Sequence, residues 1–466
     1  MRKINLITII QVSLCCFLTT TCAARTDKNQ STEISKPNII YIMADDLGYG
    51  HVGYQGQKLI PTPQIDKLAA QGMQFTQAYS GSTVCAPSRS VLMTGQHTGH
   101  TPVRGNFGPE GGRVPINAES ITIAEVLKSA GYTTGMFGKW GLGEPGTVGE
   151  PNNQGFDHWY GYLNQHRAHS YYPDYIWRNK DKVEFPENKD GGRGNFVHNT
   201  ITKEALTFIA NNKDQPFFLY VPYLLPHTEL AAPADAVAPF KGKFPYQEVA
   251  SIENRPVVKD ALAVYAGMIS TLDTDIGKIM DKLSALGLSE NTLVIFTSDN
   301  GPASEEGMDA TYFNGSGPLR GIKRDLYEGG IRVPMVAHWP NKIAAGTKSD
   351  ALTAMWDVLP TFAELAGVTP PENIDGISIV PTLFGQQQDT SKRVLYWEFQ
   401  YKKALRQAVR IGNWKAVRND KKQEIELYNL ANDLAEKNNI AAQHPRLIAQ
   451  ARQLFISERS ASIYDK

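Results

Sequence analysis

The chain has 466 residues, of which 41% are hydrophobic and 20% are charged, and its 47 basic residues balance its 47 acidic ones. This length and composition are sufficient for a large buried core and exclude a disordered protein. A net charge of zero excludes nucleic acid and acidic membranes as partners held by a general electrostatic attraction. Any anion must therefore be bound by a local pocket.

The N-terminus has the pattern of a secretory signal peptide. A basic pair precedes an apolar run over residues 4–18, which is too short for a membrane-spanning helix. We therefore predict a signal over residues 1–24, export to the periplasm or the medium, and no transmembrane segment. Two outcomes remain open, because cleavage near Ala23 would release the protein, whereas lipidation of Cys22 would anchor it to a membrane.

Five apolar runs predict buried strands with helices between them. The runs are residues 37–46, 132–143, 216–227, 291–301 and 332–340, and the helical patterns cover 61–75, 120–132 and 260–287. Apolar runs without alternation are typical of a parallel sheet covered on both faces. The alternation predicts an α/β domain with a large, doubly wound mixed sheet between helices. Ser120 is the predicted N-cap of the second helix.

Cys85 is the only cysteine predicted to remain in the body of the mature protein, since the other three lie within the first 22 residues. An intramolecular disulfide is therefore impossible, and the thiol is predicted to be reactive or modified. Pro87 suits the first turn of a helix that continues over 88–95. The free amides of that helix would face Cys85 and any anion beside it, and Arg89 lies on the same turn.

Residues 144–200 are rich in Gly, Asn, Tyr and His and predict loops over the active face. After residue 385 the runs become short, which predicts antiparallel strands within 392–432 and a final amphipathic helix over 445–460. The predicted domains are therefore a catalytic domain (36–385) and a small C-terminal antiparallel α+β subdomain (386–466).

Polar side chains follow four of the predicted strands. They are Asp45 and Asp46, Lys139, His227, and Asp299 with Asn300. In an open α/β sheet, ligands bind beyond the carboxyl ends of the strands, so these side chains are expected to converge. Three carboxylates and an amide supply hard oxygen ligands, which indicate Ca²⁺ or Mg²⁺ rather than zinc.

These segments resemble the type I, formylglycine-dependent sulfatases, which are arylsulfatase-like members of the alkaline phosphatase superfamily. Cys-Ala-Pro-Ser-Arg (85–89) is similar to the signal at which a maturation enzyme oxidises the cysteine to the aldehyde formylglycine (3-oxoalanine). NIIYIMADDLGYG (38–50) and VIFTSDNGP (294–302) resemble the metal segments of the family. FGKWGLG (137–143), PYLLPH (222–227) and LRGIKRDLYEGGIRVP (319–334) resemble its sulfate-pocket segments.

The resemblance implies a role for each matching residue. The metal, usually calcium, would be bound by Asp45, Asp46, Asp299, Asn300 and the formylglycine at position 85. The catalytic roles would belong to Arg89, which fixes the hydrated aldehyde, to Lys139 and Lys323, which bind sulfate oxygens, and to His227, which protonates the leaving alcohol. A thiol at position 85 would thus be a precursor and not the nucleophile itself.

One position departs from the pattern of the family. The family often has a histidine after the tryptophan of its Gly-Lys-Trp segment, and this chain has Gly141 after Trp140. That histidine is credited with deprotonating the hydrate when sulfate is expelled, so the base for that step remains open. His166 and His169 are candidates to replace it, although a structural role in their loop is the simpler interpretation.

The predicted function is hydrolysis of sulfate esters on a sulfated polysaccharide or oligosaccharide, with galactose or N-acetylgalactosamine units. Arg104 and Asn106 follow the Cys85 helix and are predicted to line the sugar subsite. One alternative is a phosphomonoester or phosphodiester hydrolase of the same superfamily, which would be expected to carry Ser or Thr at position 85 and further zinc ligands. The other is an inactive homologue that binds sulfated glycans.

Overall fold

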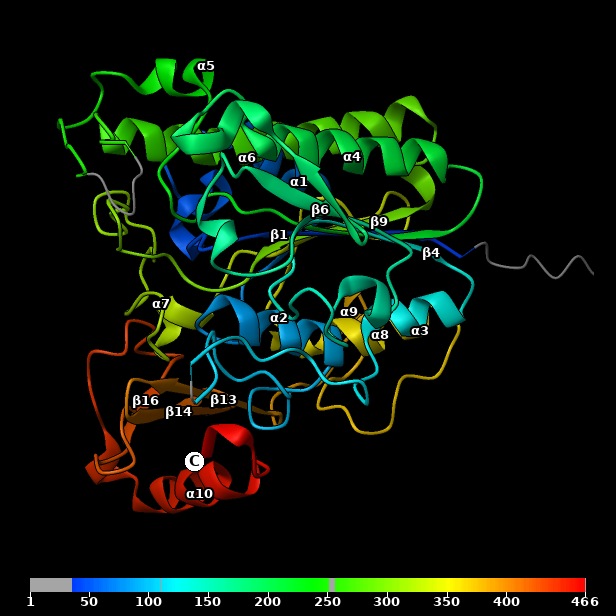
Figure 1. Cartoon of the computed structure of the whole chain (residues 1–466). Coiled ribbons are helices and arrows are strands. Elements are labelled where there is room, and N and C mark those ends of the chain that lie inside the picture. Colours follow the sequence, from blue (N-terminus) through cyan, green and yellow to red (C-terminus); the bar gives the residue numbers. More distant parts are fainter. Residues whose placement is uncertain (1–35, 110, 251–255, 466) are drawn as a thin grey trace, which may run out of the picture. The chain divides into compact units, whose positions relative to one another are not determined.

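The computed structural model describes residues 36–109, 111–250 and 256–465, so the predicted signal over 1–24 and Cys22 lie outside the described residues. The centre of the fold is a ten-stranded mixed sheet with the strand order β11-β2-β10-β9-β1-β8-β4-β5-β6-β7 (Figure 1). Its strands are β1 (Asn38–Ala44), β2 (Met73–Phe75), β4 (Thr133–Lys139), β5 (His158–Tyr162), β6 (Tyr175–Arg178), β7 (Asp181–Glu184), β8 (Phe217–Pro222), β9 (Thr292–Ser298), β10 (Val336–His338) and β11 (Thr347–Ser349). Two short strands, β3 (Ala78–Tyr79) and β12 (Thr353–Ala354), pair separately.

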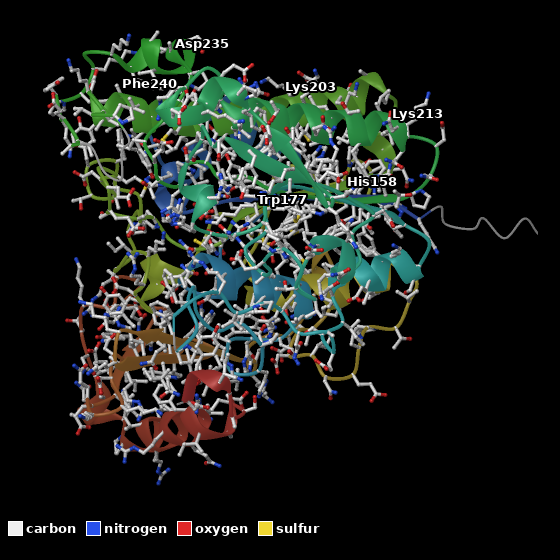
Figure 2. The ribbon with its side chains drawn as sticks, in the orientation of Figure 1. His158, Trp177, Lys203, Lys213, Asp235 and Phe240 are labelled. Atoms are coloured by element: carbon white, nitrogen blue, oxygen red, sulfur yellow. The ribbon has the colours of Figure 1, made fainter. Side chains whose placement is uncertain are left out.

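Helices cover both faces of the large sheet. The α-helices of the described residues are α1 (Pro63–Gln71), α2 (Cys85–Thr94), α3 (Ile123–Ser129), α4 (Val197–Asn211), α5 (Ala234–Val237), α6 (Ala261–Ala285), α7 (Glu328–Ile331), α8 (Val358–Ala366), α9 (Val380–Leu383) and α10 (Pro445–Ser457), of which α10 packs against the C-terminal strands instead. Figure 1 shows α4 and α6 on one side of the sheet and α2, α3 and α8 on the other. Lys203 and Lys213 lie on and just after α4, on the outer side of that layer (Figure 2). No helix within the described residues is long and apolar enough to cross a bilayer.

Strand β1 lies at the centre of the sheet and is parallel to both neighbours. Ile40 pairs with Leu219 of β8 and with Val294 of β9. Strand β4 is in turn parallel to β8, so the carboxyl ends of these four strands meet at one edge, as the sequence predicts. The fifth predicted strand, β10, runs antiparallel to β9 and makes the sheet mixed.

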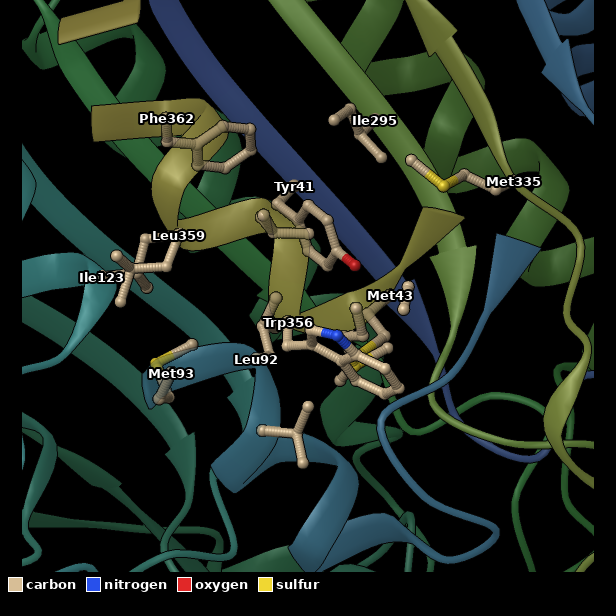
Figure 3. Close-up of a cluster of buried hydrophobic side chains, with 14 of the residues drawn as sticks. Tyr41, Met43, Leu92, Met93, Ile123, Ile295, Met335, Trp356, Leu359 and Phe362 are labelled. Carbon is tan, nitrogen blue, oxygen red and sulfur yellow. The ribbon is translucent and has the colours of Figure 1, made fainter. Parts of the chain in front are cut away.

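Alternate residues of β1 point to opposite faces and pack in two separate cores. Ile40 and Ile42 pack with residues of α1, α4 and α6. Tyr41 and Met43 pack on the other side with residues of α2, α3 and α8, where the ring of Phe362 meets Tyr41 edge to face at 6.2 Å (Figure 3). The helix that carries Cys85 is thus held against the sheet by a continuous apolar layer.

Two local predictions are wrong. The N-cap of α3 is Thr122 and not Ser120, because Thr122 accepts from the Glu125 amide while the Glu125 carboxylate accepts from the Thr122 amide, which is a reciprocal capping box. Residues 144–200 are not loops throughout, since β5 extends the sheet beside β4 and β6 and β7 form a hairpin beyond it.

The C-terminal part forms a four-stranded antiparallel sheet, as predicted. Its strands are β13 (Val394–Tyr401), β14 (Ala404–Ile411), β15 (Trp414–Arg418) and β16 (Glu426–Asn429). Tyr396 and Val409 pack on one face with Phe455 of α10, whereas Trp397 and Ala408 face the core of the large sheet. Lys415 on β15 is fully buried and pairs with Glu328 of α7 at 2.8 Å. This small sheet is thus packed tightly between α10 and the catalytic part.

Candidate active site

Cys85 is the first residue of α2 and is almost completely buried, with 1% of its surface exposed. The N-cap residue, Val84, has no polar side chain to cap the helix. Instead, the side-chain oxygen of Asn106 accepts from the Ala86 amide at 2.9 Å. The Ser88 hydroxyl donates to the backbone carbonyl of Asp299 and ties the helix start to the end of β9. The positive end of the α2 dipole is therefore fixed beside the thiol.

The polar residues that follow the parallel strands converge around Cys85. Asp45 Oδ1 lies 3.3 Å from Cys85 Sγ, and Asp45 Oδ2 lies 2.6 Å from Lys139 Nζ. The backbone amide of Asp46 donates to Asp299 Oδ1 at 3.1 Å. These side chains lie close together because β9, β1, β8 and β4 are consecutive strands of the sheet and are parallel to one another.

Three cationic side chains lie among the three carboxylates. Besides the Lys139–Asp45 contact, Lys323 Nζ lies 2.7 Å from Asp46 Oδ2. Arg89 Nη2 donates to Asp299 Oδ2 at 2.9 Å and to Asp45 Oδ2 at 3.1 Å, and its Nη1 donates to the Lys139 carbonyl. Buried charges are stable only when they are paired in this way. The three cations thus balance the charge of the three carboxylates beside Cys85.

The pKa values record how strongly these groups interact. Burial and then the neighbouring carboxylate of Asp45 raise the pKa of Asp299 to about 7, against the opposing charge of Arg89. Burial would also raise the pKa of Asp45, but the charges of Lys139, His227 and Arg89 outweigh it and hold that pKa far below its usual range. Positive charge placed here therefore stabilises the ionised carboxylates.

Burial raises the pKa of the Cys85 thiol well above its usual value, and the carboxylate of Asp45 raises it further. The nucleophilic form of cysteine is the thiolate, so an unmodified thiol at this place is unreactive at neutral pH. The position is therefore unsuited to an ordinary cysteine nucleophile, although Lys139 and Lys323 partly counteract the shift.

The donor set fits a divalent cation with hard oxygen ligands. One atom from each of Asp45, Asp46, Cys85 and His227 lies within 4.8 Å of the other three. Asn300 donates from Nδ2 to Asp46 Oδ1 at 2.7 Å, and its buried Oδ1 has no hydrogen-bond donor among the described residues. A buried amide oxygen without a partner is costly, and a bound cation would satisfy it.

His227 follows β8 and directs one ring nitrogen into the site. Its Nδ1 lies 2.8 Å from the Thr228 carbonyl and its Nε2 lies 3.6 Å from Asp46 Oδ2. Burial and then the charge of Lys139 hold the pKa of His227 well below its usual value. The ring of His169 lies 4.9 Å from that of His227, and its own pKa is lowered to about 3 by burial. Both imidazoles are therefore neutral at physiological pH.

The remaining predicted residues lie in different surroundings. His166 is exposed. Arg104 is buried and donates to Glu398 Oε1 at 3.2 Å and to the Ser460 carbonyl at 3.0 Å, so it joins the C-terminal sheet to the Cys85 segment. Its contacts give no support to a role in a sugar subsite. The side chain of Asn106 caps α2 and also lines a cavity next to the site.

One acidic residue of the site, Glu305, is not predicted from the sequence. Glu305 lies 2.9 Å from Lys323 Nζ and 2.6 Å from Arg324 Nη2, and these two cations outweigh its burial and lower its pKa to about 2. It therefore fixes the lysine that is predicted to bind sulfate. Its place shortly after Asp299 and Asn300 was the available signal, but a glutamate in a loop is ordinarily solvated.

A cavity of about 810 Å³ adjoins the Cys85 helix and extends over the C-terminal sheet. We call it the lysine cleft. Its lining includes Val84, Asn106, Phe107, Arg324, Tyr401, Lys402, Lys403, Lys421 and Lys422. The four lysines are exposed, and the acidic residues of the lining are Asp420 and Asp465. Phe107 is 61% exposed at the mouth, so the cleft combines positive charge with an apolar platform.

Comparison with known proteins places these features in a family. Residues 37–368 match the family described as Sulfatase, and residues 322–457 match the one described as N-sulphoglucosamine sulphohydrolase, C-terminal. N-acetylgalactosamine-6-sulfatase of Mus musculus is 35% identical over an alignment of 406 positions, which spans 82% of this chain and 71% of that protein. N-acetylgalactosamine-6-O-sulfatase of Bacteroides thetaiotaomicron is 31% identical over an alignment of 523 positions, which spans 95% of this chain and 97% of that protein.

Among solved structures, Ps i-CgsB in complex with k-i-k-neocarrahexaose is 30% identical to this chain. The two structures superimpose with a TM-score of 0.78, over 91% of this chain and 94% of that one.

Proposed function

This chain belongs to the sulfatase family, and we propose that it is an exported hydrolase that removes sulfate esters from a sulfated polysaccharide or oligosaccharide through a formylglycine made from Cys85. The observation that carries the proposal is the setting of Cys85. It lies at the start of α2, 3.3 Å from Asp45, and burial makes its thiol unreactive. Such a setting supports conversion of the thiol, because an unmodified cysteine here is a poor nucleophile.

Formylglycine, when hydrated, supplies one hydroxyl that attacks sulfur and a second through which sulfate is expelled. A divalent cation, calcium or magnesium, would be bound by Asp45, Asp46, Asp299, Asn300 and residue 85, and would polarise the sulfuryl group as a Lewis acid. The buried, unpartnered oxygen of Asn300 supports this assignment.

The protein's own side chains would bind and orient the sulfate group. Lys139 and Lys323 lie on either side of the carboxylate pair and present ammonium groups to sulfuryl oxygens. Arg89 bridges Asp45 and Asp299 and would fix the hydrated residue 85. Each such donor is worth roughly 3–4 kcal/mol of transition-state stabilisation, by analogy with the loss of an oxyanion-hole donor.

His227 would protonate the departing alcohol from Nε2. Its Nδ1 faces the Thr228 carbonyl, which leaves Nε2 as the nitrogen that points into the site. The pKa of His227 is low because of burial and the charge of Lys139. A bound sulfate ester brings a negative charge beside the ring and raises that pKa, so the acid form is favoured when substrate is present.

Two observations support a sulfated carbohydrate with galactose or N-acetylgalactosamine units as the substrate. The relative from Bacteroides thetaiotaomicron is named for N-acetylgalactosamine-6-O-sulfate, and Ps i-CgsB was solved with neocarrahexaose. The lysine cleft next to Cys85 offers positive charge for further anionic groups of such a chain. The N-terminal signal pattern supports export, with either a free or a lipidated N-terminus.

Peptide mass spectrometry tests the conversion directly, since the Cys85 peptide is expected to lose mass and to react with a hydrazide probe. The protein should come from a host that carries the formylglycine-generating enzyme. Unmodified thiol throughout would contradict the proposal. Release of free sulfate from defined sulfated oligosaccharides, with aryl phosphate as a comparison, separates a sulfatase from a phosphoesterase. Binding of sulfated glycans without sulfate release would indicate an inactive binding homologue.

A further inference from the structure

The side chain of Gln165 fills the place where a side chain at position 141 would begin. Beyond the β4–β5 ladder, Trp140 N donates to the Tyr162 carbonyl at 2.9 Å and Gly141 N donates to the Leu163 carbonyl at 3.0 Å. Gln165 lies two residues after Leu163, and its side chain lies against Gly141. A Cβ atom at position 141 would lie only 2.8 Å from Gln165 Nε2.

Gly141 also has a backbone conformation that side chains disfavour, with φ at +83°. A histidine here would therefore meet both a strained backbone and the amide of Gln165. The side chain of Gln165 thus places a polar group where Gly141 has none.

Two buried donors at this place have no acceptor. Gln165 is 3% exposed, and its Nε2 makes no hydrogen bond with any described residue. The Nε of Arg89 is likewise unpartnered, whereas the other two guanidinium nitrogens bind Lys139, Asp45 and Asp299. The Cδ atom bonded to that Nε lies 3.8 Å from the Cβ position of residue 141. Both side chains thus lie beside position 141, and buried donors in folded proteins are almost always satisfied, which points to an oxygen atom that accepts from both.

We infer that Gln165 Nε2 and Arg89 Nε together bind one oxygen of the reaction centre, and that Gln165 thereby replaces the side chain absent from position 141. The oxygen belongs either to the sulfuryl group or to a hydroxyl of hydrated residue 85. The inference rests on the proposed function, because both oxygens belong to sulfate ester hydrolysis. A carboxamide donates without titrating, so Gln165 positions the oxygen equally well across the working pH range. It is not the missing base.

Sulfate affinity provides a test that does not depend on formylglycine. In the Cys85→Ser background, calorimetry with inorganic sulfate should show binding that Gln165→Ala weakens about tenfold, which is the usual effect of losing one hydrogen bond to a charged group. Gln165→Glu should weaken it further, because a carboxylate accepts but does not donate and repels the anion. Gln154→Ala is the matched control, since it removes a buried amide that is bonded to the Val148 carbonyl.

Turnover by the formylglycine form gives the second readout. Gln165→Ala should lower kcat on an aryl sulfate by about tenfold or more, while Gln154→Ala should change the melting temperature but not kcat. Unchanged sulfate affinity and kcat in both Gln165 variants would overturn the inference. A higher melting temperature together with full activity in Gln165→Glu would also overturn it, because the side chain would then accept a hydrogen bond from Arg89. A wild-type protein that binds sulfate but releases none from any ester would contradict the proposed function. The effect of the Gln165 variants on sulfate affinity would still test the inference about Gln165.

Discussion

The side-chain nitrogen of Asn300 donates to Asp46 across 2.7 Å, while the oxygen of the same amide is buried without a donor. This one-sided pairing predicts that divalent cations stabilise the fold. Calcium at 100 times its dissociation constant should stabilise chelator-treated protein by about 2.7 kcal/mol. Asn300→Ala should remove most of the increase in melting temperature. Asn212→Ala, at a buried asparagine bonded to the Phe208 carbonyl, should retain it. An equal response in both variants would place the cation elsewhere.

The loss of rate on removing the leaving-group acid should depend on the substrate. His227→Ala is expected to lower kcat on a sugar sulfate by roughly 100-fold or more, because an alcohol leaves poorly without a proton. The loss on 4-nitrophenyl sulfate should be much smaller, since that phenolate leaves unassisted. His158→Ala, at an exposed histidine at the start of β5 (Figure 2), should leave both rates unchanged. Equal losses on the two substrates would argue that His227 is not the acid.

The lysine cleft should matter only for polymeric substrates. Lys402→Ser combined with Lys403→Ser is expected to raise KM for a sulfated polysaccharide by roughly three- to tenfold at low salt, and less at high salt. KM for an aryl sulfate should not change. The control is Lys203→Ser with Lys213→Ser, which removes two exposed charges in and after α4 (Figure 2). A polymer KM that responds equally to both pairs would indicate a general charge effect.

Arg104 should act through stability and not through substrate binding. Its buried contact with Glu398 joins the Cys85 segment to β13, so Arg104→Ala is expected to destabilise the protein by about 3–5 kcal/mol. Urea unfolding measures this loss, and KM of the remaining folded enzyme should be unchanged. Arg178→Ala breaks an exposed pair with Glu204 and should cost less than about 1 kcal/mol. A large KM effect with full stability would instead support the predicted sugar subsite.

The buried cluster between α7 and the C-terminal sheet should make stability depend on pH. Burial, together with the carboxylate of Glu328, raises the pKa of Glu436 to about 7 against the opposing charge of Lys415. A carboxyl whose folded-state pKa is raised contributes stability below its usual pKa near 4.5, and this is lost as the pH rises through about 7. The unfolding free energy should therefore fall less between pH 5 and pH 8 in Glu436→Gln than in the wild type. The slopes of the two curves should differ by roughly the linkage slope of one proton. Parallel curves would contradict this assignment.

The parts of the fold that follow from periodicity could be predicted from the sequence. Continuous apolar runs located β1, β4, β8 and β9, and the rule that ligands bind at strand ends brought Asp45, Lys139 and Asp299 together correctly. The direction of β10 could not be predicted, because an isolated apolar run carries no information on pairing. The hairpin β6–β7 was missed because aromatic and charged residues mask its alternation.

The finer contacts of the site depend on tertiary structure. Arg104 follows the Cys85 helix closely in sequence, yet its guanidinium turns to Glu398 nearly three hundred residues later. Gln165 gave no signal, because a lone glutamine in a loop is usually solvated. Only the parallel pairing of β4 with β5 brings it over Gly141. Sequence thus located the polar groups that meet at the strand ends, while the packing of distant strands decides how they are supported.

The pairing of β1 sets the order of events during biosynthesis. Its partners are β8 and β9, which end at Pro222 and Ser298, so both emerge from the ribosome long after Cys85. Until then the central strand has no neighbours and the residues around the thiol cannot enclose it. Because Cys85 is buried once these strands have paired, any enzyme that converts it must act before the chain has folded.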